Sequence, residues 1–137
     1  MPSTLGACED LPVVTRCYAL NASLLIAHEI DSAYWHEWEM FGMPGGNGLF
    51  VVLHVALAWL VLIAYGEVVR GRRSARLFSA LLAGVGILTV AIHVLFLAAG
   101  RPEFRSPVSI GLLTGIAVVS VAQLTLAARP SRKRTGA

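Results

Sequence analysis

The sequence predicts an all-α integral membrane protein, a four-helix up-down-up-down bundle that forms a single domain over residues 1–137. Two observations predict this class. Hydrophobic residues make up 56% of the chain and charged residues only 14%, and the mean hydropathy of +0.70 exceeds that of ordinary soluble domains. In addition, four apolar stretches have the length of about 20 residues that a helix needs to cross a bilayer. These stretches cover residues 13–34, 49–69, 77–99 and 108–128.

Helix-breaking residues separate the four stretches. Each connection contains glycine or proline, at positions 44–48, 71 and 100–102. Ser106 before Pro107 predicts the start of the last helix, because proline is favoured in the first helical turn. The connections are short, so consecutive helices should be antiparallel neighbours.

Positive charge is concentrated on one side of the predicted bundle. Of the eleven Lys and Arg residues, only Arg101 and Arg105 lie between the third and fourth stretches. The others fall on the opposite side: Arg16, Arg70, Arg72, Arg73, Arg76, Arg129, Arg132, Lys133 and Arg134. Cytoplasmic loops carry an excess of positive charge, which predicts a multi-pass protein of the cell membrane with both termini in the cytoplasm. The basic tail, residues 129–137, has no aromatic residue to stack on bases, so we expect it to contact the lipid bilayer and not nucleic acid.

The outer end of the first stretch is the most polar part of the predicted bundle. Residues 27–43 read AHEIDSAYWHEWEMFGM. On a helix that continues through this segment, His28, Asp31 and Glu39 share one stripe with Trp35, because three or four residues separate each from the next. Ionisable groups in a membrane span cost a few kcal/mol each and usually face the bundle interior. The stripe therefore predicts a buried polar site, with Trp35 as a wall.

The second and third stretches each supply one His at a comparable depth. His54 lies five residues into the second stretch, and His93 lies about six residues before the end of the third. The antiparallel topology brings both toward the outer end of the first stretch, where His36 forms a second stripe with Glu29. All four His residues and most of the carboxylates should therefore gather in the outer half of the membrane.

Simpler interpretations apply to several residues of this segment. Glu29 and Glu37 point away from the main stripe, which favours an interfacial position for both. Tyr34, Trp35, Trp38 and Phe41 are typical of the aromatic belt at a membrane surface, which is the simpler interpretation of Trp35 as well. His28 could merely pair with Asp31 or donate to a carbonyl group.

Three fragments carry a resemblance to known proteins. These are the run HEIDSAYWHEWEMFGMPGG, the His of the second stretch, and HVLF followed by EFRSP. Together they resemble small bacterial four-helix membrane proteins of unknown function, of the HXXEE-motif and related uncharacterised families. The resemblance covers nearly the whole chain and implies a four-helix membrane fold with a polar site.

Three functions compete for this site. Imidazole together with carboxylate suits zinc, iron or manganese, which predicts a metal-dependent enzyme acting on a lipid or other hydrophobic small-molecule substrate. The expected metal ligands are His28, Asp31, His54 and His93, and the expected catalytic residues are His36 and Glu39. The second hypothesis is an electron-transfer protein that binds haem b, with His54 and His93 as axial ligands. The third is a non-enzymatic membrane subunit or proton-relay element, for which the short chain favours a homo-oligomer.

Overall fold

The computed structural model describes residues 5–129, and the side chains of residues 11–129. Over this range the protein is helical, which confirms the prediction of an all-α protein. The helices are α1 Leu5–Tyr34, α2 Glu37–Met40, α3 Gly46–Val69, α4 Ala75–Ala98 and α5 Pro107–Ala128. The predicted basic tail lies outside the described residues from position 130 onward.

The long helices match the apolar stretches of the sequence closely. Helices α3, α4 and α5 begin and end within three residues of the predicted stretches. Helix α5 starts as expected, because the Ser106 hydroxyl accepts a hydrogen bond of 3.0 Å from the backbone N–H of Ser109 and Pro107 occupies the first turn. Helix α1 ends at Tyr34 as predicted but begins earlier, at Leu5, since a helix does not need apolar side chains in order to start.

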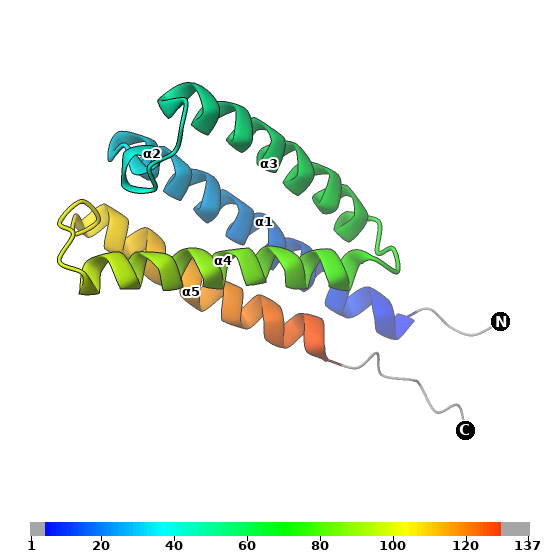
Figure 1. Ribbon diagram of the computed structural model, residues 1–137. Coiled ribbons are helices and arrows are strands. Elements are labelled where there is room, and N and C mark those ends of the chain that lie inside the picture. The colour runs from blue at the N-terminus through cyan, green and yellow to red at the C-terminus, as the bar shows by residue number, and fades with distance from the viewer. Residues whose placement is uncertain (1–4, 130–137) are drawn as a thin grey trace.

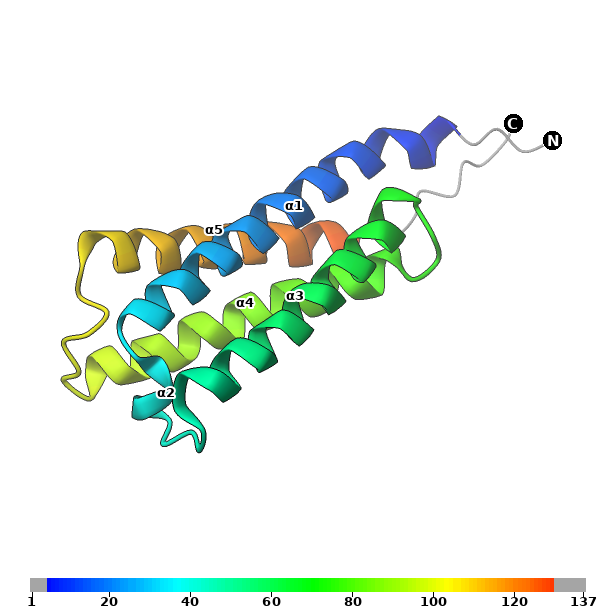
Figure 2. The ribbon, with the colours of Figure 1, turned by 90° about the horizontal axis from the view of Figure 1, so that it is seen from above.

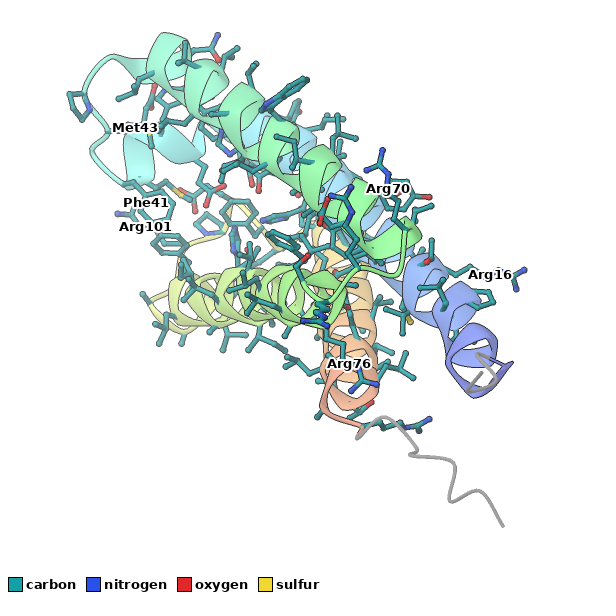
Figure 3. All side chains as sticks on the ribbon, turned by 90° about the vertical axis from the view of Figure 1, so that its right-hand side faces the viewer. Arg16, Phe41, Met43, Arg70, Arg76 and Arg101 are labelled. Atoms are coloured by element: carbon teal, nitrogen blue, oxygen red, sulfur yellow. The ribbon has the colours of Figure 1, made fainter. Side chains whose placement is uncertain are left out.

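The four long helices run lengthwise with alternating direction along the chain (Figure 1). Both ends of the described chain lie at one end of the molecule, and α2 and the α4–α5 connection lie at the other (Figure 2). The labelled Arg16, Arg70 and Arg76 are likewise separated from the labelled Phe41 and Met43 (Figure 3). Arg16, Arg70 and Arg76 thus lie toward the end that carries the termini, whereas Arg101 and Arg105 belong to the α4–α5 connection at the other end.

Three of the helices are long and apolar enough to cross a membrane: α3, α4 and α5. Each has between 22 and 24 residues, and a helix of 22 residues is about 33 Å long, roughly the thickness of a bilayer core. Within the described part of the chain, α1 is not in this group, because its middle carries polar and ionisable side chains. The structure thus has three helices that could span a membrane, which agrees with the apolar pattern of the sequence and suggests a membrane protein.

The polar side chains of α1 lie on its buried face. Tyr18, Asn21, Leu25, His28 and Ser32 follow one another at intervals of three or four residues, and all are buried. This spacing places them on one side of the helix, which faces the three apolar helices. Helix α1 therefore turns its polar groups toward the protein and away from its surroundings.

A network of amide and hydroxyl groups joins α1, α4 and α5. We call it the amide network; its members are Asn21, Ser79, Ser120 and Gln123, all fully buried. The Asn21 amide donates to Gln123 Oε1 at 2.7 Å and to Ser120 Oγ at 3.1 Å, and the Gln123 amide donates to the Ser79 carbonyl at 2.9 Å. Such interhelical hydrogen bonds hold helices together where no water competes for the polar groups.

Helices α4 and α5 are tightly packed at Gly86. A Cβ atom added at Gly86 would lie 2.2 Å from Ser120 Oγ and 3.1 Å from a methyl group of Ile116. Gly84, two residues earlier, faces open space. The missing side chain at Gly86 thus lets the backbones come close enough for Ser120 to reach the amide network.

Candidate metal centre

The end of α1 departs from a continuous helix at His36. This residue has φ 56° and ψ 45°, the left-handed conformation that is uncommon for residues other than glycine. The turn ends α1 at Tyr34 and starts the short helix α2 at Glu37. Glu37 is only 7% exposed as a result, so the interfacial position expected for it is wrong.

Three side chains from different helices meet at this end of the bundle. They are His28 of α1, Glu37 of α2 and His93 of α4, and we call them the imidazole cluster. Each offers a potential ligand atom that lies within 4.8 Å of the other two. The imidazole rings of His28 and His93 are 4.5 Å apart between centroids, and His93 Nε2 lies 3.6 Å from Glu37 Oε1. Two imidazoles and one carboxylate form a donor set that transition-metal ions accept.

The hydrogen bonds of His93 fix the state of its ring. The backbone carbonyl of Thr89 lies 2.8 Å from His93 Nδ1, and a carbonyl oxygen can only accept, so Nδ1 carries a proton. In the neutral ring, Nε2 then carries a lone pair, and it faces the carboxylate of Glu37. Two acceptors that face each other need a proton, a cation or a water between them. When one ring nitrogen of a histidine binds a metal ion, the other usually donates a hydrogen bond to a carbonyl or carboxylate, which fixes the orientation of the ring.

Two ring nitrogens of the cluster are buried without a hydrogen-bond partner among the described residues. These atoms are His28 Nδ1 and His93 Nε2, on side chains that are 1% and 2% exposed. The other nitrogen of His28 lies 3.4 Å from the Ser32 hydroxyl. A buried polar group without a partner costs about 1–3 kcal/mol, so its presence in a folded protein calls for a ligand or a functional reason.

Aromatic side chains close one side of the cluster. Phe104, in the α4–α5 connection, is fully buried and packs edge-on against His93, with ring centroids 4.3 Å apart. The same ring lies 6.3 Å from His28. Phe104 thereby shields both imidazoles and helps to fix their orientation.

A cavity of about 200 Å³ opens beside the imidazole cluster. Its walls mix ionisable and apolar side chains from α1, α2, α3 and α4. The lining residues are His28, Glu29, Glu37, Phe41, Met43, Phe50, His54, Thr89, Ile92 and His93. The expected convergence of His28, His54 and His93 on one place is therefore present in the structure.

The other predicted site residues do not line this cavity. Asp31, expected as a ligand, is half-buried beside the inward face of α1, and its Oδ2 has no hydrogen-bond partner in the described chain. His36 and Glu39, expected as catalytic residues, are exposed. The stripe that joined Asp31 and Trp35 to Glu39 required a helix running through residue 39, and the left-handed turn at His36 interrupts it.

Two carboxylates that the sequence placed at the interface line the cavity instead. Glu37 turns inward because of the His36 conformation, which no glycine or proline in the segment signals. Glu29 pairs with His54, with Nε2 and Oε2 2.5 Å apart. An ionisable residue inside a span usually has a partner, and the equal depths of residues 29 and 54 were the available signal for this pair.

The comparison with known families bears on this arrangement. Residues 14–130 match a family of unknown function, DUF6713. The chain belongs to this family. The match covers the imidazole cluster and all of α3, α4 and α5, so the site is part of the region that defines a DUF6713 protein. No curated protein and no solved structure matches the chain. A family of unknown function agrees with the resemblance, while the link to the HXXEE group stays a prediction.

Proposed function

We propose that this protein is a four-span membrane protein that binds a divalent transition-metal ion at His28, Glu37 and His93. The observation that carries the proposal is that His28, Glu37 and His93 are all buried and each offers a potential ligand atom within 4.8 Å of the other two. In addition, one ring nitrogen of each imidazole has no hydrogen-bond partner among the described residues. A metal ion would satisfy all three groups at once.

A four-span topology gives the site a consistent position in the membrane. The apolar helices α3, α4 and α5 supply three spans, and α1 supplies the fourth because its polar groups face them. The positive charges then place both termini in the cytoplasm and the imidazole cluster in the outer half of the cell membrane. Cysteine accessibility labelling tests this: residues introduced at Asn47 and Arg72 should react from opposite sides of the membrane.

The number of protein ligands suggests a catalytic site and not a structural one. Structural zinc sites usually have four protein ligands, whereas catalytic sites with two His and one Glu keep a position open for water or substrate. The open position would face the neighbouring cavity, whose apolar walls include Phe41, Phe50 and Ile92. We therefore propose a metal-dependent enzyme for a lipid or other hydrophobic substrate, in which the ion activates a water or polarises the substrate.

Haem binding is the alternative function. It is supported by one observation: His54 and His93, the expected axial ligands, line the same cavity. The present packing offers it little room. The cavity volume of about 200 Å³ is below the roughly 300–1,000 Å³ of pockets for drug-sized ligands. Phe104 also packs against the His93 ring.

Metal analysis of the detergent-purified protein tests the proposal directly. Zinc, iron and manganese would be measured together with a visible spectrum, because a bis-His haem gives an intense Soret band and zinc gives none. We expect a bound divalent ion that is lost in His93→Ala and retained in His36→Ala, a matched control with an exposed imidazole in the same half of the protein. A folded protein that neither contains nor takes up a metal ion would overturn the proposal.

A further inference from the structure

A second pair of potential ligands faces the same cavity. His54 of α3 and Glu29 of α1 contact each other, and neither belongs to the imidazole cluster. His54 Nδ1 lies 2.6 Å from the backbone carbonyl of Phe50, four residues earlier, so Nδ1 donates and Nε2 points to Glu29. His93 is held in the same manner by the carbonyl of Thr89, also four residues earlier. His54 and His93 therefore have the same arrangement: Nδ1 donates to a carbonyl, and Nε2 faces a carboxylate.

The two groups of ligands line the same cavity. All five ionisable residues line a single cavity of about 200 Å³, and they come from four helices: His28 and Glu29 from α1, Glu37 from α2, His54 from α3 and His93 from α4. In known two-metal sites the ions are about 3.5–4 Å apart, which a cavity of this size accommodates.

We propose that the cavity holds two divalent metal ions, the second bound by Glu29 and His54. This inference rests on the proposed function, because the first ion at the imidazole cluster is its starting point. Glu37 carries two oxygen atoms and stands as the carboxylate that both ions share. Carboxylate and imidazole ligands contributed by facing helices are the arrangement that helical bundles use for paired iron or manganese ions.

The second ion would take the place of a proton. Nδ1 of His54 already donates, so the contact of 2.5 Å between Nε2 and Glu29 Oε2 requires a hydrogen atom between the two. A metal ion bound by both atoms at about 2.0–2.2 Å would move them apart, from 2.5 Å to roughly 3 Å or more. The side chains can adjust, because those of His54 and Glu29 are 25% and 34% exposed.

The charge balance indicates what completes the centre. Two divalent ions bring four positive charges, and Glu29 and Glu37 supply two negative ones, while three neutral imidazoles add none. An oxygen anion that bridges the ions reduces the remaining charge. Hydroxide is the simplest such ligand: a bound water releases its proton to solvent and the oxygen coordinates both ions.

The number of ions bound by the full chain in detergent tests the inference. The metal-depleted protein would be titrated with Mn²⁺, with bound metal counted by elemental analysis and spin coupling followed by electron paramagnetic resonance. We expect two ions per chain and a coupled signal in the wild type. His54→Ala and Glu29→Gln should each bind one ion and lose the coupling. Glu29→Gln can keep a hydrogen bond to His54, so it remains informative if His54→Ala fails to fold.

The outcomes separate this inference from the proposed function. A wild-type protein that binds no ion overturns both. A single ion that is lost in His93→Ala and unaffected by His54→Ala overturns only the second position. A single ion that depends on both His54 and His93 means one mononuclear site with a larger ligand set, and it also overturns the paired centre. His36→Ala serves as the control and should bind two ions.

Discussion

The amide network and the imidazole cluster are both buried polar groups that connect α1 to α4, yet they differ in how their atoms are satisfied. The amides of Asn21 and Gln123 use their donors and acceptors within the network. In the imidazole cluster, His28 Nδ1 and His93 Nε2 have no hydrogen-bond partner. Groups buried for stability bring their own partners, whereas groups kept without one are available to an added ligand. The comparison predicts that mutations in the two regions have separable effects.

The largest expected effect is the loss of metal affinity when a cluster ligand is removed. In His93→Ala or His28→Ala, the dissociation constant for Zn²⁺ should rise by at least about 100-fold, since changes to groups that merely support a ligand already cost 10–100-fold. Calorimetric titration of the detergent-purified protein measures it. Acidification should also release the ion, because protons compete for the imidazoles and the carboxylate.

A mutation in the amide network provides the opposite pattern. Gln123→Leu should leave the dissociation constant for Zn²⁺ within about twofold of the wild type while lowering stability, because no network residue lines the cavity. If Gln123→Leu abolished metal binding in a folded protein, the two regions would form one cooperative unit and the distinction drawn above would fail.

The next largest expected effect is a loss of stability at the tight contact between α4 and α5. Gly86→Ala places a Cβ atom 2.2 Å from Ser120 Oγ and should lower the free energy of unfolding by about 1–3 kcal/mol, the usual cost of overpacking. Gly84→Ala is the matched control, because nothing lies within 4 Å of its added Cβ. Unfolding of the purified protein by a denaturing detergent compares the two. Equal stability of both variants would contradict the close approach of α4 and α5.

A smaller effect is expected from removing one amide. Gln123→Ala deprives the Asn21 amide of its 2.7 Å acceptor and should lower the free energy of unfolding by about 1 kcal/mol. Thr125→Ala removes a hydroxyl from an exposed position of the same helix and serves as the control. A Gln123→Ala protein as stable as Thr125→Ala would show that the network does not hold the helices together.

The smallest effect is expected at His36. His36→Gly removes the cost of a left-handed conformation but gains freedom in the unfolded chain, so stability should change by less than about 1 kcal/mol. Metal affinity should stay unchanged, because His36 is exposed and does not line the cavity. A loss of affinity in this variant would restore His36 to the functional role that the sequence predicted for it.

Much of the helical fold could be predicted from the sequence because its signals are local. The lengths of the apolar stretches and the Ser106–Pro107 helix start depend on neighbouring residues, and the structure has helices at those places. The convergence of His54 and His93 followed from the antiparallel order of the helices. In both cases the sequence pattern is compatible with only one main structural interpretation.

The remaining parts of the site depend on a turn that the sequence does not announce. A left-handed residue is usually glycine or asparagine, but here it is His36, and neither Trp35 nor Glu37 beside it signals a turn. The turn brings Glu37 inward and leaves Glu39 exposed. Periodicity alone continues the helix and therefore selects Asp31 and Glu39, residues that do not line the cavity.

The polar face of α1 has a consequence for how the protein enters the membrane. Three polar side chains of α1 would lose their water on insertion: Asn21, His28 and Ser32. The helices that bury them, α3, α4 and α5, are synthesised after α1. Helix α1 therefore gains little by partitioning alone, and its stable insertion depends on synthesis of the C-terminal half. In the proposed four-span arrangement, Ser120 and Gln123 of α5 would pair with Asn21 only after α5 has been synthesised, so α5 would assist the insertion of α1.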